Sequence, residues 1–149
     1  MYKKILVPVD GSEASFQAVD NCLEFAKNAN VSKIVILTVT GVPPQLRAYK
    51  GEGGEVYSQM KSLLTKDAQD LLDDTKKRFA NCPVPVETRL IWGEVPYTIV
   101  QEAKEGEYDL IIMGNRGLGG VENLLLGSVS LHVVRQAPCT VMVTRRRRE

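Results

Sequence analysis

The segment that runs from Gly114 to Ser128 has the residue types that bind anions. Its glycines stand at positions 114, 117, 119, 120 and 127. Glycine tolerates a left-handed backbone and lets the main chain approach a bulky ligand closely, and successive N–H groups in such a turn can form a nest for an anion. Arg116 is the only cation in the segment, and the hydroxyls of Ser128 and the nearby Ser130 can donate to anion oxygens. These residues favour a phosphate-binding turn over a merely structural glycine-rich one.

Two familiar nucleotide motifs are absent. The chain has no G-x-x-x-x-G-K-[ST] sequence, which excludes a Walker-type loop. A G-x-G-x-x-G match that starts at Gly117 fails because Glu122 stands where the third glycine belongs. If the segment binds phosphate, it does so by another pattern.

Residues suited to catalysis are sparse. His132 is the single histidine and falls within a predicted helix, where we expect a surface or half-buried side chain rather than a general base. The three cysteines, Cys22, Cys82 and Cys139, match no metal-binding spacing. We expect them to be reduced structural thiols, with a redox sensor as the alternative. Asp10 could hold a metal ion and permit slow hydrolysis of a phosphoanhydride, a reaction that also needs a positioned water.

Short apolar runs alternate with longer helical patterns along the chain. Runs typical of strands cover Lys4–Val9, Lys33–Val39, Val86–Ile91, Asp109–Met113 and Thr140–Thr144. The first predicted helix follows Ser12, a suitable N-cap; the others cover Val56–Phe79, begin near Pro96, and cover Ser128–Gln136. In the second helix the apolar stripe consists of Met60, Leu63, Leu64, Ala68, Leu71, Leu72 and Phe79. Thr40–Glu55, rich in proline and glycine, predicts a loop.

This alternation indicates an α/β fold with a five-stranded parallel sheet and helices on both faces. Strands buried on both sides read as unbroken apolar runs, as most of these do. Such sheets bind ligands beyond the carboxyl ends of their strands, at a topological switch point. That rule singles out Asp10, Val39–Thr40, Gly93 and Gly114.

Size and composition indicate one domain, which we expect to cover residues 1–144. The chain has 149 residues, of which 44% are hydrophobic and 25% charged. Arg145–Arg148 make residues 145–149 a basic tail, whereas the rest of the chain is slightly acidic. We expect a solvated terminus there, with contact to nucleic acid or an acidic partner as the less favoured alternative. We find neither a membrane-spanning stretch nor an export signal and expect a cytoplasmic protein.

The glycine segment resembles the signature of the universal stress protein family. The ATP-binding branch of that family has G-x-x-G, nine residues, then G-[ST]. Gly114, Gly117 and Gly127-Ser128 match it at every fixed position. The resemblance covers nearly the whole chain, since four further segments also resemble the family: Lys4–Ser12, Gly93–Pro96, Asp109–Gly114 and His132–Cys139. Two minor departures are Thr140, where proline is frequent, and Asn115, where serine is common.

The resemblance implies the strand order 3-2-1-4-5, which makes the first and fourth strands neighbours. Asp10 and Gly114 would then face each other across the ligand crevice, with Asp10 near the adenosine and the backbone of Val39 offered to the adenine. The implied nucleotide-binding residues are Pro8, Val9, Asp10, Val39, Met113, Gly114, Arg116, Gly117, Gly119, Gly127, Ser128, Val129 and Ser130. Mg²⁺ or Mn²⁺ on the phosphates is also implied.

Several of these residues have a simpler interpretation. Asp10 could stabilise its own turn, and Val39 could be plain sheet core. Arg116 could be a solvated loop charge, and Ser130 a helix-surface serine. The glycines and Ser128 have the strongest claim to contact a phosphate.

The leading hypothesis is an ATP-binding regulatory protein of the stress-protein type, in which the nucleotide switches the conformation or the dimer state. The alternatives are a slow metal-dependent ATP hydrolase and a dimeric scaffold that binds no nucleotide. In the implied order the strand 140–144 is an edge strand, and an exposed apolar edge invites pairing with a second copy. We therefore expect a homodimer through that strand.

Overall fold

The computed structural model describes residues 1–41, 43, 54–117 and 125–145. Three sequence-based predictions fall wholly or mostly on the other residues: the ligand role of Gly119, most of the loop Thr40–Glu55, and the basic tail beyond Arg145. They lie outside the described residues.

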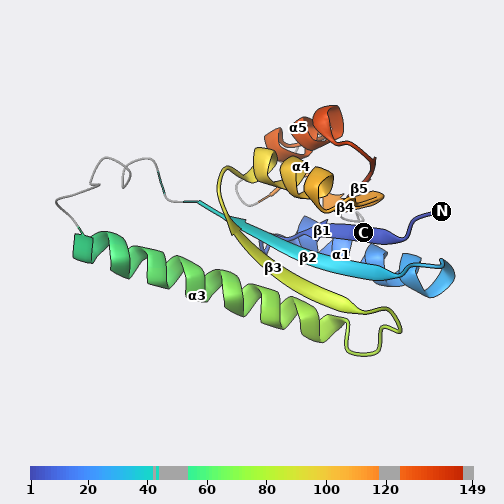
Figure 1. Cartoon of the computed structure of the whole chain (residues 1–149), viewed down its shortest axis with the longest axis horizontal. Coiled ribbons are helices and arrows are strands. Elements are labelled where there is room, and N and C mark those ends of the chain that lie inside the picture. The colour runs from blue at the N-terminus through green and yellow to red at the C-terminus, as the bar shows by residue number, and fades with distance from the viewer. Residues whose placement is uncertain (42, 44–53, 118–124, 146–149) are drawn as a thin grey trace.

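Five parallel strands form one sheet: β1 (Lys4–Pro8), β2 (Lys33–Thr40), β3 (Val86–Trp92), β4 (Leu110–Gly114) and β5 (Thr140–Thr144). Their order is β3-β2-β1-β4-β5, which confirms the predicted topology. β1 and β4 are neighbours in the middle, although most of the chain separates them in sequence (Figure 1). The predicted strand bounds agree with these to within one residue.

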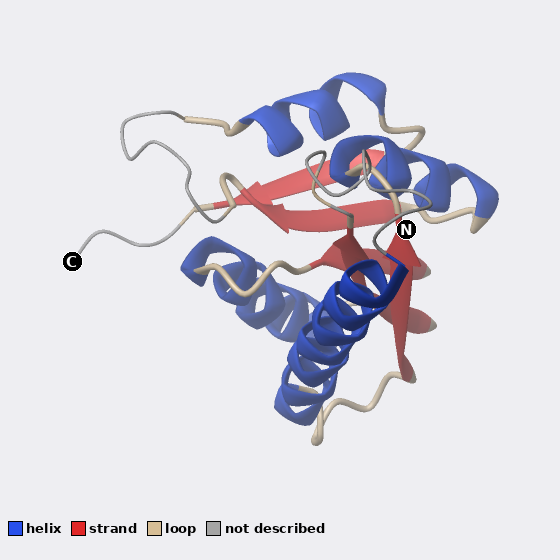
Figure 2. Cartoon of the chain, turned by 90° about the vertical axis from the view of Figure 1, so that its left-hand side faces the viewer, coloured by secondary structure: helices blue, strands red, loops and turns tan. Residues whose placement is uncertain are grey.

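Among the described residues, four helices cover the two faces of the sheet: α1 (Glu13–Asn28), α3 (Gly54–Arg78), α4 (Val95–Glu105) and α5 (Ser128–Gln136). α1 and α3 lie on one face, and α4 and α5 on the other (Figure 2). Within the described ranges, no helix is long and apolar enough to span a membrane.

The central strands are buried because each face of the sheet packs against helices. Along β1, Ile5 and Val7 contribute to the core beneath α1 and α3, and Leu6 contributes to the core beneath α4 and α5. All three are fully buried. The unbroken apolar runs therefore have the explanation expected for a sheet covered on both sides.

α3 differs from its prediction at both ends and along its stripe. The helix begins at Gly54, and β2 continues through Thr40, so the predicted loop Thr40–Glu55 was too long at both ends. Leu63, expected on the apolar stripe, is 59% exposed. Only the second half of α3 packs on the sheet, whereas its first half extends past the ends of β2 and β3 (Figure 1). Periodicity alone could not show where the sheet ends.

The cysteines are free thiols in the described chain. Cys22 is fully buried on α1, and burial together with the nearby Cys82 raises the pKa of the Cys22 thiol to about 12. A thiol with so high a pKa stays protonated at neutral pH and is a poor nucleophile. Cys22 therefore fits the expectation of a structural thiol.

Candidate functional site

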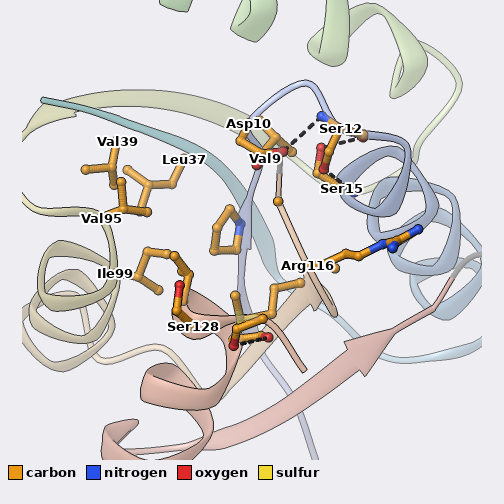
Figure 3. Close-up of a pocket in the computed structure, with 17 residues that line it drawn as sticks. Val9, Asp10, Ser12, Ser15, Leu37, Val39, Val95, Ile99, Arg116 and Ser128 are labelled. Atoms are coloured by element: carbon orange, nitrogen blue, oxygen red, sulfur yellow. Dashed lines mark hydrogen bonds between the residues drawn. The ribbon is translucent and has the colours of Figure 1, made fainter. Parts of the chain in front are cut away.

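A cavity of about 290 Å³ opens at the carboxyl ends of β1 and β4, the predicted switch point. Its lining residues come from β1, β2, β4, α1, α4 and α5 and from the turns between them (Figure 3). Among the residues predicted from the sequence, it brings together Pro8, Val9, Asp10, Val39, Met113, Gly114, Arg116, Gly117, Gly127, Ser128, Val129 and Ser130. Their contact with a nucleotide stays a prediction.

The turn from β1 to α1 satisfies its own backbone. The carboxylate Oδ1 of Asp10 accepts a hydrogen bond from the Ser12 amide at 2.9 Å, and Gly11 has φ +86°. The hydroxyl of Ser12 accepts from the Ser15 amide at 3.2 Å, which is the geometry of a helix N-cap. Asp10 therefore has the turn-stabilising role that was considered for it, and its side chain also reaches the cavity.

Two glycines allow the β4–α5 turn to approach the β1–α1 turn. A Cβ on Gly114 would lie 2.7 Å from the carbonyl carbon of Ala14, in the first turn of α1. A Cβ on Gly117 would collide with Oδ2 of Asp10. The expectation that Asp10 faces the exit of β4 agrees with this packing. Gly114 requires glycine because the backbone of α1 fills the space, whereas a side chain at residue 117 would first have to displace the Asp10 carboxylate.

Asn115, which the sequence marked only as a minor departure, is almost fully buried at 5% exposure. Its carbonyl oxygen accepts from the Gly127 amide at 2.6 Å and from the Ser130 hydroxyl at 2.6 Å. Its amide Nδ2 donates to the carbonyl of Leu125 at 3.1 Å. Asn115 therefore connects the exit of β4 to the beginning of α5.

α5 begins without a side-chain cap. Gly127 is its N-cap residue, and the first turn contains no acidic residue. The amides of a first helical turn have no intrahelical partner, and the helix dipole makes that end favourable for an anion. Ser128 is exposed and lines the cavity. The start of α5 therefore offers N–H groups to a ligand.

Ser130 is not the helix-surface residue that was considered for it. It is 1% exposed, and its hydroxyl donates to the carbonyls of Asn115 and Gly127. The hydroxyl proton is thus committed to the turn. A direct hydroxyl donation from Ser130 to a phosphate would require that arrangement to change.

One guanidinium nitrogen of Arg116, Nη1, is buried and has no hydrogen-bond partner in the described part of the chain. A solvated loop charge would have water around that nitrogen, so that interpretation of Arg116 is wrong for this atom. Leaving a buried charged donor unpaired costs free energy. Figure 3 shows the Arg116 side chain extending toward α1, on the opposite side of the cavity from Val39 and Ile99.

The cavity wall opposite Arg116 is apolar, and the sequence predicted only some of its residues. Its residues are Leu37, Val39, Val95, Ile99 and Met113. Val39 is half-buried and packs against the core beneath α4 while also lining the cavity, so it is both core and wall. Leu37, Val95 and Ile99, together with Ser12 and Ser15, were not predicted. Proximity to the strand ends was the only signal that could have suggested them.

The arrangement is suited to binding a ligand that is flat and apolar at one end and anionic at the other. Asp10 is the only carboxylate among the described lining residues. His132 lies elsewhere, against Tyr97, with ring centroids 4.6 Å apart. In the described ranges no three His, Cys, Asp or Glu side chains come together in a way that could hold a metal ion.

Comparisons with known proteins agree with the fold. A putative universal stress protein of Staphylococcus aureus is 38% identical to this chain, with 97% of the chain and 84% of the relative covered. Universal stress protein UspA from Lactobacillus plantarum has a similar structure, with a TM-score of 0.80, 28% identity, and 97% and 98% of the two chains covered.

A structure of a universal stress protein in complex with cAMP is also similar, with a TM-score of 0.66 and 27% identity over 97% of each chain. The profile of the Universal stress protein family matches residues 1–145. The chain belongs to the universal stress protein family.

Proposed function

We propose that this protein binds ATP in the cavity between the β1–α1 and β4–α5 turns. The observation that carries the proposal is the polarity of that cavity. One wall is apolar, and the other presents glycine backbone, the uncapped start of α5 and part of Arg116. An adenosine group suits the first wall and a phosphate chain the second.

Each wall has a specific role in this proposal. Val39, Val95 and Ile99 would pack against the adenine ring. The amides of Ser128 and Val129 would donate to phosphate oxygens, and Arg116, which lines the cavity, would add a positive charge near them. Mg²⁺ or Mn²⁺ would be held mainly by the phosphates themselves, with Asp10 as the carboxylate nearest to them.

The complex of a related protein with cAMP supports an adenine nucleotide as the ligand class. It leaves two candidates, ATP and cAMP, that differ in their phosphate groups. The start of α5 together with Arg116 provides several donors, which favours the polyphosphate of ATP over the single cyclic phosphate.

Binding would serve regulation, through a change in conformation or in dimer state. β5 is an edge strand whose apolar residues Val141, Met142 and Val143 are only half-buried. Such an edge can pair with the same strand of a second copy. Light scattering should therefore find a dimer at micromolar concentration, and a monomer would overturn this part of the proposal.

The test is to denature the purified protein, identify any released nucleotide by mass spectrometry, and then measure thermal unfolding with ATP and Mg²⁺. At a hundredfold excess over Kd, ATP should add about 2.7 kcal/mol to the free energy of unfolding. In a protein of this size that is a rise in Tm of roughly 5–10 °C. cAMP at the same concentration should give a smaller rise.

Two glycine variants complete the test. Gly127→Val should abolish the ATP-dependent rise, because its two methyl groups extend beyond a Cβ that already lies 3.2 Å from Cα of Arg116 and would enter the proposed phosphate position. Gly54→Val is the matched control, since nothing lies within 4 Å of a Cβ at Gly54, and it should keep the rise. Absence of released nucleotide together with no rise in the unmodified protein would contradict the proposal.

A further inference from the structure

We propose that Asn115 is the positioning residue of this cavity and that its side chain sets the direction of the α5 amides toward a phosphate. The inference deepens the proposed ATP binding and rests on it. Asn115 would not touch the nucleotide. It would act through the segment that does, which the proposal identifies as residues 127–130.

Several hydrogen bonds converge on the buried residue Asn115. Its backbone N–H donates to the carbonyl of Thr144 at 2.8 Å, which connects it to β5. The carbonyl of Asn115 accepts from Gly127 and Ser130, and the side chain donates to Leu125. One residue at the end of β4 is therefore bonded to the last strand of the sheet and to the start of α5.

The hydrogen bond of the Asn115 side chain has no substitute among the described residues. The bonds to Gly127 and Ser130 use the carbonyl of residue 115, which every residue type has. The bond to the Leu125 carbonyl uses Nδ2, and only a side chain with a donor at that reach can form it. Water can replace this donor at the exposed Leu125, but water does not connect residue 125 to the end of β4 as the Asn115 side chain does.

Close packing also connects Asn115 to Gly127, the N-cap residue of α5. A Cβ on Gly127 would lie 3.4 Å from the Asn115 carbonyl oxygen and 3.2 Å from Cα of Arg116. The start of α5 is therefore in contact with residues 115 and 116, and a small shift at residue 115 must move it. Affinity that depends on the direction of N–H groups is sensitive to such shifts.

The first experiment needs no ligand. Asn115→Leu replaces the side-chain amide by an apolar group of similar size. Hydrogen exchange of the ligand-free protein should become about tenfold faster at the hydrogen-bonded amides of this segment, Gly127 and Leu131. Asn28→Leu is the matched control, because the Asn28 amide donates to the Glu24 carbonyl at 3.0 Å on an exposed part of α1. It should leave exchange at the Gly127 and Leu131 amides unchanged.

The second experiment measures Kd for ATP directly and for adenosine by competition. Asn115→Leu should weaken ATP by about tenfold and adenosine by less than about twofold, because only ATP uses the α5 amides. Asn115→Ser, a milder change in case the leucine variant does not fold, should show the same selective loss to a smaller extent.

The outcomes separate the inference from the proposed function. Equal losses for ATP and adenosine, no loss for either, or unchanged exchange at the Gly127 and Leu131 amides would overturn the positioning role. If the unmodified protein binds no ATP, the proposed function fails. Hydrogen exchange then still decides whether Asn115 orients the start of α5.

Discussion

Two strand–turn–helix units meet at the cavity, and their helices begin in opposite ways. α1 is capped by the Ser12 hydroxyl and has Glu13 in its first turn. α5 begins at Gly127 with neither a side-chain cap nor an acidic residue in its first turn. At the start of α1 the Ser12 hydroxyl accepts from the Ser15 amide. At the start of α5 the Gly127 amide donates to the Asn115 carbonyl, and Ser128, Val129 and Ser130 line the cavity.

This difference identifies which of the two turns serves the ligand. A capped start with an acidic first turn has less to offer an anion, because the cap uses one of its amide donors and the carboxylate repels the anion. An uncapped start next to Arg116 has both donors and positive potential. The β1–α1 turn thus forms one wall of the cavity, and the β4–α5 turn provides the phosphate site in the proposed function.

The largest expected effect on ATP affinity comes from capping the start of α5 with an acidic side chain. Gly127→Asp would give α5 a carboxylate cap of the kind that helices favour. Its backbone at φ −76° and ψ 173° accepts any residue type. The carboxylate would occupy and repel the phosphate position, so ATP affinity should fall by about a hundredfold. Isothermal titration calorimetry measures this loss.

Gly127→Ala is the control for that variant, since it adds the same Cβ without charge or cap. It should weaken ATP much less than Gly127→Asp does. Equal losses in the two variants would mean that bulk, and not the open helix start, explains the result.

The next largest effect on ATP affinity is expected from removing the positive charge of Arg116. Arg116→Gln should weaken ATP by about tenfold, because a charge-assisted partner of the phosphates is lost. It should not lower Tm in the absence of nucleotide, because the buried Nη1 has no partner in the described chain whose loss would matter. Fluorescence titration and thermal melts measure the two quantities.

Arg89→Gln should behave in the opposite way. Arg89 forms a 2.6 Å ion pair with Glu102, a carboxylate that is 5% exposed and lies outside the cavity lining. Since Arg89 itself is half-exposed, we expect a loss of only about 1–2 kcal/mol in the free energy of unfolding. ATP affinity should be unchanged. Loss of ATP binding in this variant would argue against a local role for Arg116.

The smallest expected effect on ATP affinity comes from removing the side-chain cap of α1. Ser12→Ala removes the cap of α1 and should cost about 1 kcal/mol of stability, measured by urea denaturation. ATP affinity should change by less than about threefold, because the proposed phosphate site is on α5. A loss as large as that of Gly127→Asp would reverse the comparison between the two turns.

Much of this arrangement was predictable because local sequence determines it. The strand order followed from the resemblance, and the alternating apolar runs identified the elements it connects. The glycines at 114, 117 and 127 marked the turn because a Cβ there would collide with the backbone of α1, collide with the Asp10 carboxylate, or lie in tight contact with Arg116, respectively. Spacing along one segment thus carried most of the information about the polar wall.

The remaining features depend on contacts between distant segments. Leu37 and Ile99 read as ordinary core residues, and nothing local shows that they border a cavity. Asn115 looked like a minor departure because its importance lies in bonds to Leu125, Gly127 and Thr144. Leu63 was expected to be buried, but the sheet ends before it reaches that part of α3.

The most direct test of the account is an NMR titration of ¹⁵N-labelled protein with ATP and, separately, with adenosine. The account predicts that ATP shifts the amide resonances of Ser128 and Val129 far more than adenosine does, while those of Glu13 and Ala14 respond similarly to both. If adenosine shifts the α5 amides as much as ATP does, or if the phosphates affect α1 instead, the start of α5 is not the phosphate site.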